Sequence, residues 1–330
     1  MNSSLSQKGK KIQSSSSNDL YSDLSLDGPF RVAVEDDIVV KDKARDKHIR
    51  FKIYFPETGT KFPLILFSHG FGGNKNGFAP VGKHWASHGF VVIHPTHFDG
   101  LAPSSGLLEP APTTSLLSQM RLGSIRNRIS EPKNIRDRVQ DFVVILDEID
   151  NLAKLVPRLT GKVDESKIGV GGHSFGAYTA MLIGGTTVNL GKDFASSYAD
   201  KRIKCILPIS AQGTGQQGLT RDSWKNVRIP MMVITGTNDR GVGNQGYEWK
   251  MEPYEYSGPG DKFLVVIDGA NHFSFGGQLG PRGLKAVDCV KCVSTHFWNT
   301  YLKESGASGK VIMSDTLPRE LRGIHTYRHK

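Results

Sequence analysis

Residues 167–180 constrain the fold of this chain more than any other stretch. A short apolar run at 168–170 leads into the pattern Gly-x-Ser-x-Gly, centred on Ser174, and helix-forming residues follow at once. The pattern predicts a strand, a sharp turn and a helix, with Gly172 and Gly176 removing side chains that would clash. The serine hydroxyl would then stand at the C-terminal end of a strand. The alternative is a glycine-rich turn whose serine only caps the helix.

From residue 62 onward, continuous apolar runs alternate with amphipathic stretches. The runs predict strands that are covered on both faces, and the stretches predict helices. Two alternating segments before residue 62 predict antiparallel strands. The fold class is therefore α/β, a mostly parallel doubly wound sheet with helices on both faces and antiparallel N-terminal edge strands. Strands are expected at 31–40, 48–55, 62–67, 90–93, 168–170, 203–210, 231–235 and 263–267, and helices at 77–88, 134–155 and 282–302.

The ends of the chain differ in composition from its middle. Residues 1–27 are polar and serine-rich without an apolar core, which predicts a disordered leader rather than a signal peptide. Residues 28–304 would form one domain, with 96–131 as a long active-site loop or lid, and 305–330 would be a C-terminal tail. No apolar run of about 18 residues exists, so we expect no integral membrane segment. These features predict a cytoplasmic protein, or a secreted or periplasmic one if a leader has been removed.

The net charge of +10 and the three cysteines limit the functions to consider. The basic excess favours solubility and attraction to anionic surfaces or substrates, and without a recognisable nucleic-acid motif we expect no nucleic-acid partner. Cys205 lies in an apolar run. Cys289 and Cys292 form a C-x-x-C pair inside a helical pattern with no strand before it, so we favour two helical thiols over a redox pair.

A serine hydroxyl needs an adjacent base, and the base needs a carboxylate that orients it. After Ser174, Asp239 follows the apolar run 231–235, and His272 follows the run 263–267. Both would meet Ser174 at the C-terminal edge of a parallel sheet. Asp268 is a rival acid, but it is too close to His272 in sequence to reach its far ring nitrogen easily. His173 is next to Ser174 and is expected to point away from it.

The same edge predicts groups that would contact a substrate. An oxyanion would be stabilised by the backbone N–H groups of Phe175 and of Phe71, in the glycine-rich loop after 62–67, unless that loop is a simple turn. Further contacts are expected from four side chains, whose aromatic members could equally be ordinary packing: His69, Gln212, Trp224 and Trp249. Three histidines, His69, His94 and His97, could line the cleft, but they lack the spacing and carboxylates of a metal site, so we expect no metal.

Three segments resemble a known family. Residues 67–72, 172–176 and 269–273 resemble the platelet-activating-factor acetylhydrolase and dienelactone-hydrolase-like branch of the α/β-hydrolases, which is related to cutinase-like polyester hydrolases. The resemblance covers about residues 29–302 and implies a triad of Ser174, Asp239 and His272, with Phe71 and Phe175 as oxyanion donors. The sequence departs from dienelactone hydrolases, whose nucleophile is cysteine. It also lacks the disulfide and signal peptide that are usual in secreted polyester hydrolases.

These observations predict a serine carboxylic-ester hydrolase that acts through an acyl-enzyme on short- to medium-chain acyl esters, with no cofactor. A second hypothesis is a lipase- or cutinase-like hydrolase of lipid or polyester substrates, including acetylhydrolase-type phospholipid esters. A third is a catalytically inactive hydrolase fold used as a binding module, which competent residues at every predicted catalytic position disfavour. The expected partner is a small-molecule or lipid or polymer ester, and the oligomeric state stays open.

Overall fold

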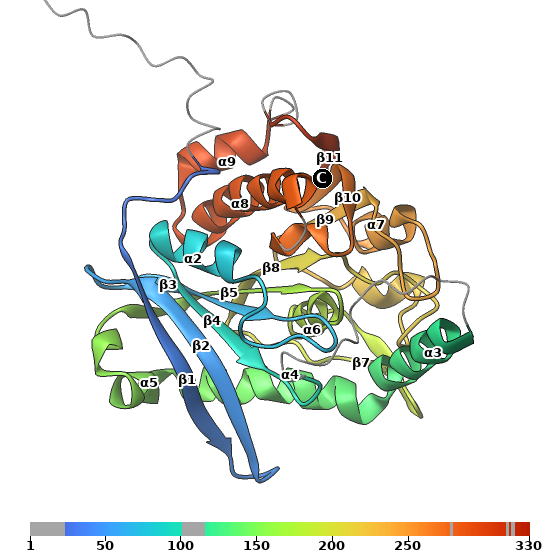
Figure 1. The fold of residues 1–330 in the computed structure, drawn as a ribbon, viewed down its shortest axis with the longest axis horizontal. Helices are drawn as coiled ribbons and strands as arrows, with labels where there is room; N and C mark the ends of the chain where they lie inside the picture. Colours follow the sequence, from blue (N-terminus) through green and yellow to red (C-terminus); the bar gives the residue numbers. More distant parts are fainter. Residues whose placement is uncertain (1–23, 101–115, 278–279, 315–316, 318–320) are drawn as a thin grey trace, which may run out of the picture.

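A twisted sheet runs through the middle of the molecule, with helices on both of its faces (Figure 1). The computed structural model describes residues 24–100, 116–277, 280–314, 317 and 321–330. Within these residues the sheet has nine strands in the order β1-β2-β4-β3-β5-β8-β9-β10-β11. The α/β-hydrolase fold class expected from the sequence is confirmed.

The six central strands are parallel, and the flanking strands are antiparallel. The chain enters the centre at β3, moves to β4 on one side, and then returns to β5 on the other side of β3. Such a reversal opens a crevice at the carboxyl ends of the strands, where ligands bind in open α/β sheets. The strands are β1 (Val32–Asp42), β2 (Lys47–Pro56), β3 (Phe62–Ser68), β4 (Val91–Thr96), β5 (Val163–His173), β8 (Ile203–Ile209), β9 (Met231–Asn238), β10 (Lys262–Asn271) and β11 (Ile324–His329).

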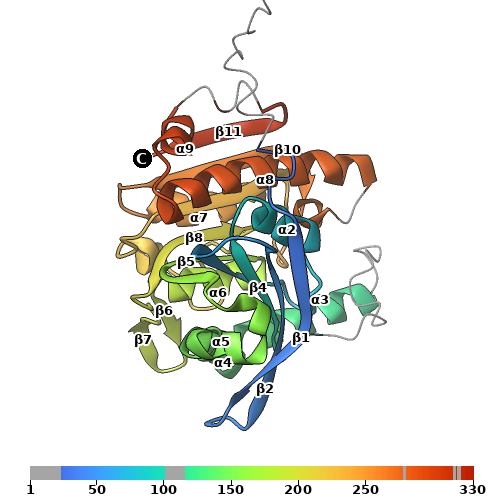
Figure 2. The same cartoon turned by 90° about the vertical axis from the view of Figure 1, so that its left-hand side faces the viewer.

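One face of the sheet is covered by α2 (Ala79–Ser87) and α8 (Gly280–Leu302), with α9 (Gly306–Ile312) packed on α8 (Figures 1 and 2). The core on this face is rich in aromatic side chains. Trp85 and Trp298 meet edge to face, with ring centroids 5.8 Å apart, and the Trp85 indole donates to Ser294 Oγ at 2.8 Å. Such pairs add stabilisation beyond the burial of their area.

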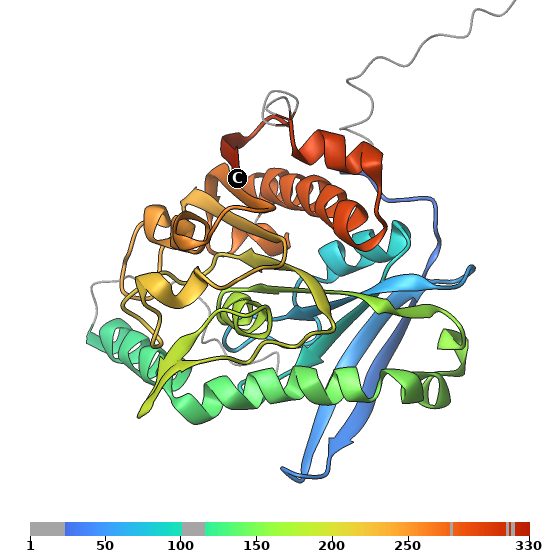
Figure 3. The same ribbon diagram turned by 180° about the vertical axis from the view of Figure 1, so that it is seen from behind.

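The other face carries α4 (Pro132–Asp147), α5 (Ile149–Leu155), α6 (Phe175–Ile183) and α7 (Tyr247–Tyr256), and α3 (Leu116–Ser130) lies against α4 (Figure 3). A two-stranded hairpin, β6 (Val188–Leu190) and β7 (Asp193–Ser196), lies apart from the main sheet. The single-turn helices are η2 (Pro157–Leu159), η3 (Arg221–Trp224) and η4 (Ser274–Gly276). The buried faces of α4 and α6 pack mainly aliphatic side chains against the sheet.

The structure differs from the sequence-based expectations at several points. The stretch 134–155 forms two helices, α4 and α5, because the chain leaves helical geometry at Glu148. Residues 305–330, which we assigned to a tail, contribute α9 and the edge strand β11. The segment 96–131 contains α3, and its residues 101–115 lie outside the described part, as does most of the expected leader. Within the described residues, no helix is long and apolar enough to span a membrane.

Candidate active site

Ser174 occupies a sharp turn between β5 and α6. Its φ of 55° and ψ of −119° lie in a region that non-glycine residues rarely adopt, and its N–H donates to Ile209 O at 2.9 Å. A Cβ on Gly172 would lie 2.2 Å from Gly176 O, and one on Gly176 would lie 2.0 Å from Ser68 O. Both glycines are therefore needed for the close approach of backbone around the serine, and the strain at Ser174 is held by the packing on either side.

Asp239 and His272 lie side by side because their strands are neighbours in register. Asn271 of β10 pairs with Asn238 of β9, so the next residue of each strand faces the other. The Nδ1 atom of His272 is 3.1 Å from Oδ1 of Asp239, and Thr235 Oγ1 donates to the second carboxylate oxygen at 3.0 Å. Asp239 is fully buried, whereas the His272 side chain is 25% exposed. This is the geometry of a base oriented by a carboxylate.

The rival acid Asp268 lies elsewhere. Its carboxylate is 3.5 Å from the hydroxyl of Thr237 and faces solvent. Among the described contacts of His272, the acidic partner is Asp239.

The turn at Ser174 and the loop that carries His272 are joined through His173. The Nε2 atom of His173 donates to the backbone oxygen of His272 at 2.8 Å, and the two rings lie 4.7 Å apart. Within the described residues, no hydrogen bond joins the Ser174 hydroxyl to the imidazole of His272. A loose contact between nucleophile and base is usual in the absence of substrate. The catalytic roles of Ser174, Asp239 and His272 stay predictions.

The loop after β3 passes directly against the Ser174 turn. A Cβ on Gly70 would lie 3.4 Å from Cβ of Ser174. Phe71 follows in this loop, with the Arg128 guanidinium of α3 5.4 Å from its ring centroid. Phe175 begins α6 and is buried. The two residues predicted to supply oxyanion donors thus flank Ser174 on separate elements.

A buried arginine of α4 bonds to the loop that contains Phe71. The Arg138 side chain is fully buried and donates to His69 O at 2.7 Å and to Gly70 O at 3.3 Å. It forms an ion pair with Asp99 at 2.7 Å, and Asp99 in turn accepts a hydrogen bond from the Gly72 N–H at 3.1 Å. Burial alone would raise the pKa of Asp99, but the charge and hydrogen bonds of Arg138, together with smaller contributions from His69 and His97, outweigh it and lower that pKa to about 2.

Arg138 also contacts the second predicted oxyanion residue, because its guanidinium lies 4.4 Å from the centroid of the Phe175 ring. Charge-assisted bonds and stacking of this kind fix geometry better than a lysine could. Arg138 and Asp99 therefore hold the backbone on both sides of Phe71, and no sequence pattern predicts either of them at the site.

The four side chains predicted to contact substrate lie in different surroundings. His69 is buried, with Nδ1 2.6 Å from Gly70 O, and its Nε2 accepts from the His97 N–H at 3.0 Å. Trp224 is fully buried against Met181. Trp249 is half-buried, and its indole N–H donates to the backbone oxygen of Thr214 at 2.8 Å. Gln212 is 6% exposed, and its Oε1 atom has no hydrogen-bond partner among the described residues. Of the four side chains, Gln212 therefore has a buried acceptor that is available to a substrate.

The histidines considered as metal ligands bond to protein groups instead. His97 lies between Ser68 Oγ at 2.9 Å and Asp141 at 2.9 Å, and Nδ1 of His94 is 3.0 Å from Gly77 O. Burial lowers the pKa of His94 to about 3 and that of His97 well below its usual value. The described residues contain no group of three or more side chains arranged to hold a metal ion.

The environment of the cysteine pair in α8 does not favour redox reactivity. Burial raises the pKa of Cys289 to about 11 and that of Cys292 to about 12, which keeps both thiols protonated. A reactive cysteine needs the opposite shift.

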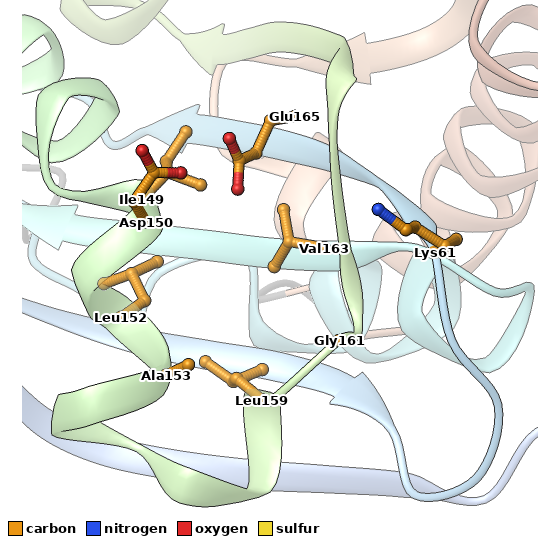
Figure 4. Close-up of a pocket in the computed structure, with 9 residues that line it drawn as sticks. All are labelled: Lys61, Ile149, Asp150, Leu152, Ala153, Leu159, Gly161, Val163 and Glu165. Atoms are coloured by element: carbon orange, nitrogen blue, oxygen red, sulfur yellow. The ribbon is translucent and has the colours of Figure 1, made fainter.

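A cavity of about 200 Å³ lies at the opposite end of the sheet, where β3 and β5 begin (Figure 4). Asp150 and Glu165 face each other across it, and their hydrogen bond raises the pKa of Glu165. Because chemistry in parallel sheets gathers at the carboxyl ends of strands, this cavity is not the candidate active site.

Similar sequences are found among known proteins. A sequence model of the family described as "Platelet-activating factor acetylhydrolase, isoform II" matches residues 51–276. The chain is 33% identical over 237 residues to "Platelet-activating factor acetylhydrolase" of Canis lupus familiaris, which covers 66% of this chain and 49% of that protein. It is 29% identical over 141 residues to the protein of the same name from Cavia porcellus, with 38% of this chain and 32% of that protein covered.

A bacterial protein also aligns. The chain is 25% identical over 222 residues to "Cutinase est2" of Thermobifida alba, which covers 67% of this chain and 56% of that protein. The aligned part of this chain thus spans from about a third to just over half of the length of these relatives.

Proposed function

Because the chain belongs to the platelet-activating factor acetylhydrolase isoform II family, we propose that it is a serine esterase that cleaves carboxylic esters through an acyl-enzyme. The observation that carries this proposal is the hydrogen bond of 3.1 Å between His272 and Asp239, at the same sheet edge as the strained turn at Ser174. A base held by a carboxylate beside a serine on such a turn is the arrangement that nucleophilic catalysis requires.

In the proposed mechanism, His272 takes the proton of the Ser174 hydroxyl as the oxygen attacks the ester carbonyl. The backbone N–H groups of Phe71 and Phe175 stabilise the resulting oxyanion, and Asp239 stabilises the imidazolium. The tetrahedral intermediate collapses, and His272 gives its proton to the departing alcohol. Water then attacks the acyl-enzyme with His272 as the base, and the acid is released.

The names of the relatives define the two substrate classes to compare. The mammalian relatives are named for hydrolysis of an acetyl group from platelet-activating factor, and the bacterial relatives are named cutinases. We propose short- to medium-chain acyl esters as the substrates of this chain, with acetylhydrolase-type phospholipid esters among them. The second candidate is a cutinase-like activity on lipid or polyester, which the alignment over 67% of the chain favours.

The test replaces the proposed nucleophile and a matched serine. We expect Ser174→Ala to lower turnover of p-nitrophenyl acetate or butyrate by about 10⁴-fold or more, because no other group can accept the acyl chain. Ser166→Ala, at the exposed start of the same strand, is the control and should keep its activity. A fluorophosphonate probe should label the native chain at Ser174.

Retained turnover in the Ser174→Ala variant would refute the mechanism, and the absence of any adduct on Ser174 would favour an inactive binding module. Rates across p-nitrophenyl esters of increasing chain length, with a polyester film alongside, separate the two substrate classes.

A further inference from the structure

A buried lysine lies behind the His272–Asp239 pair, and the proposed mechanism does not use it. Lys250 of α7 is 2% exposed, and its Nζ atom is 3.6 Å from Oδ1 of Asp239. Helix α7 packs against β9 and β10, the strands that Asp239 and His272 directly follow (Figure 1). Burying an ammonium group is costly unless it is paired, and a buried ion pair is seldom a gain in stability over apolar side chains. Stability alone therefore does not explain why a lysine is buried at this position.

A strained serine connects this lysine to the imidazole. Ser210 follows the last residue of β8, is fully buried, and has a φ of 56°, although it is not glycine. Its Oγ atom is 2.9 Å from Nζ of Lys250 and 2.9 Å from Nδ1 of His272. Its N–H donates to Ile234 O at 2.7 Å, which holds the unfavourable backbone conformation in place. Strain of this kind persists only where the surroundings fix it, and it gathers at functional sites.

We propose that Lys250 and Ser210 are positioning residues of the acid–base pair: Ser210 fixes His272 against Asp239, and the charge of Lys250 opposes the addition of a proton to the pair. This inference rests on the proposed esterase function, because it gives His272 the role of the base. A base must be neutral to accept the proton of the nucleophile.

The effect of Lys250 follows from the charges around the pair. Burial alone would raise the pKa of Asp239, but Lys250 and hydrogen bonds from His272 and Ser210 outweigh it and bring it to about 2. A proton that is added to a coupled imidazole and carboxylate makes the pair more positive, whichever of the two groups holds the proton. A neighbouring cation opposes that addition. Loss of the Lys250 charge should therefore make the pair easier to protonate.

Among the described contacts of His272, the remaining titratable group is His173, whose ring is 4.7 Å away. Burial lowers the pKa of His173 well below its usual value, so it stays neutral through the range in which the esterase would work. Burial also lowers the pKa of Lys250, and the Asp239 carboxylate opposes that shift. Among the described residues in contact with the pair, Lys250 is thus the group that supplies positive charge.

The test is the pH profile of kcat/KM for p-nitrophenyl butyrate in the Lys250→Met variant, which keeps the length of the side chain and removes its charge. We expect the midpoint of the acidic limb to move to higher pH by about one unit. We also expect kcat on the plateau to fall by about ten-fold, because Asp239 and His272 are less well held. A merely structural role for Lys250 would lower stability and leave the midpoint in place.

Lys262→Met is the matched control. Lys262 is also fully buried, but it begins β10, whereas His272 follows the end of that strand. The paired strand β9 covers the same span from Met231 to Asn238, roughly 23 Å, so this variant should lose stability without a shift of the acidic limb. Thermal unfolding of each variant gives its folded fraction before the profiles are compared.

An unchanged midpoint in folded Lys250→Met would overturn the inference. If that variant does not fold, Ser210→Ala decides: we expect kcat to fall by about ten-fold with little change in KM, and an unchanged kcat would overturn the proposal. Labelling of Ser174 by a fluorophosphonate separates the two levels. A labelled serine with an unshifted profile refutes only the role of Lys250 and Ser210, whereas an unlabelled serine refutes the esterase function itself.

Discussion

Replacement of Arg138 by Met should destabilise the fold and weaken catalysis together. The change leaves the buried carboxylate of Asp99 without its cation and removes donors from the backbone oxygens of His69 and Gly70. Breaking a buried ion pair costs about 3–5 kcal/mol, and each buried acceptor left unpaired costs about 1–3 kcal/mol if it finds no water. The terms are not additive, so we expect a loss of about 3–5 kcal/mol from the free energy of unfolding, a large part of the total for a typical domain.

Urea unfolding followed by tryptophan fluorescence measures this loss, and p-nitrophenyl butyrate turnover measures the consequence for the loop that contains Phe71. The double variant Arg138→Met with Asp99→Leu is the informative comparison, because it removes the orphaned charge. We expect it to recover much of the stability but not the turnover, since no guanidinium remains to bond to the loop. A loss below about 1 kcal/mol in the single variant, or restored turnover in the double variant, would refute the reasoning.

Two further predictions concern the serine turn and the acidic groups of the site. Gly176→Ala would place a Cβ 2.0 Å from Ser68 O, so we expect a turnover loss of about 100-fold or more and a lower Tm, measured by ester assay and thermal unfolding. Asp99 and Asp239 have pKa values lowered from 3.8 to about 2 in the folded state. The stability that they contribute is therefore present above about pH 4 and is lost as the pH falls toward 2. Urea unfolding at a series of pH values measures this loss. A free energy of unfolding that stays constant across that range would contradict the prediction.

The sequence was sufficient to find the edge of the sheet at which the candidate site lies, because each predicted group follows an apolar run. Asp239 comes directly after β9 and His272 directly after β10. Apolar runs of this length mark buried strands, and parallel strands present their ends at the same edge. The placement of both side chains therefore depended on the strands alone, and the register of Asn271 with Asn238 then made them neighbours.

The supporting residues were not accessible to the same reasoning. Lys250 lies in α7, a polar helix with an internal Pro253 and no clear apolar face, and a lysine in such a stretch gives no sign of being buried. Arg138 lies in an amphipathic helix, where a charge is expected on the outer face. In both cases burial follows from pairing with an aspartate outside the helix, and no pattern within the helix contains that pairing.

Hydrophobic periodicity also failed to predict a helix end, because the apolar pattern continues past the break. Ile145, Leu146, Ile149 and Leu152 continue one apolar stripe, yet the helix ends between them at Glu148. Near the end of the chain, β11 is only half-buried because it pairs at an edge, so its weak alternation was taken for a tail. Hydrophobic pattern reports which side chains are buried, and backbone breaks and edge pairing depend on tertiary contacts instead.

Two buried ion pairs lie next to different parts of the candidate site. Arg138 and Asp99 lie behind the loop that contains Phe71, and Lys250 and Asp239 lie behind the imidazole. The apolar clusters on both faces of the sheet already supply burial, and ion pairs of this kind are commonly no more stable than apolar side chains of the same volume. What the pairs provide is direction, because each carboxylate or guanidinium fixes the group in front of it through bonds of defined geometry. Apolar replacement of either pair should therefore separate stability from turnover, and that separation distinguishes a preorganised site from a core that happens to contain charges.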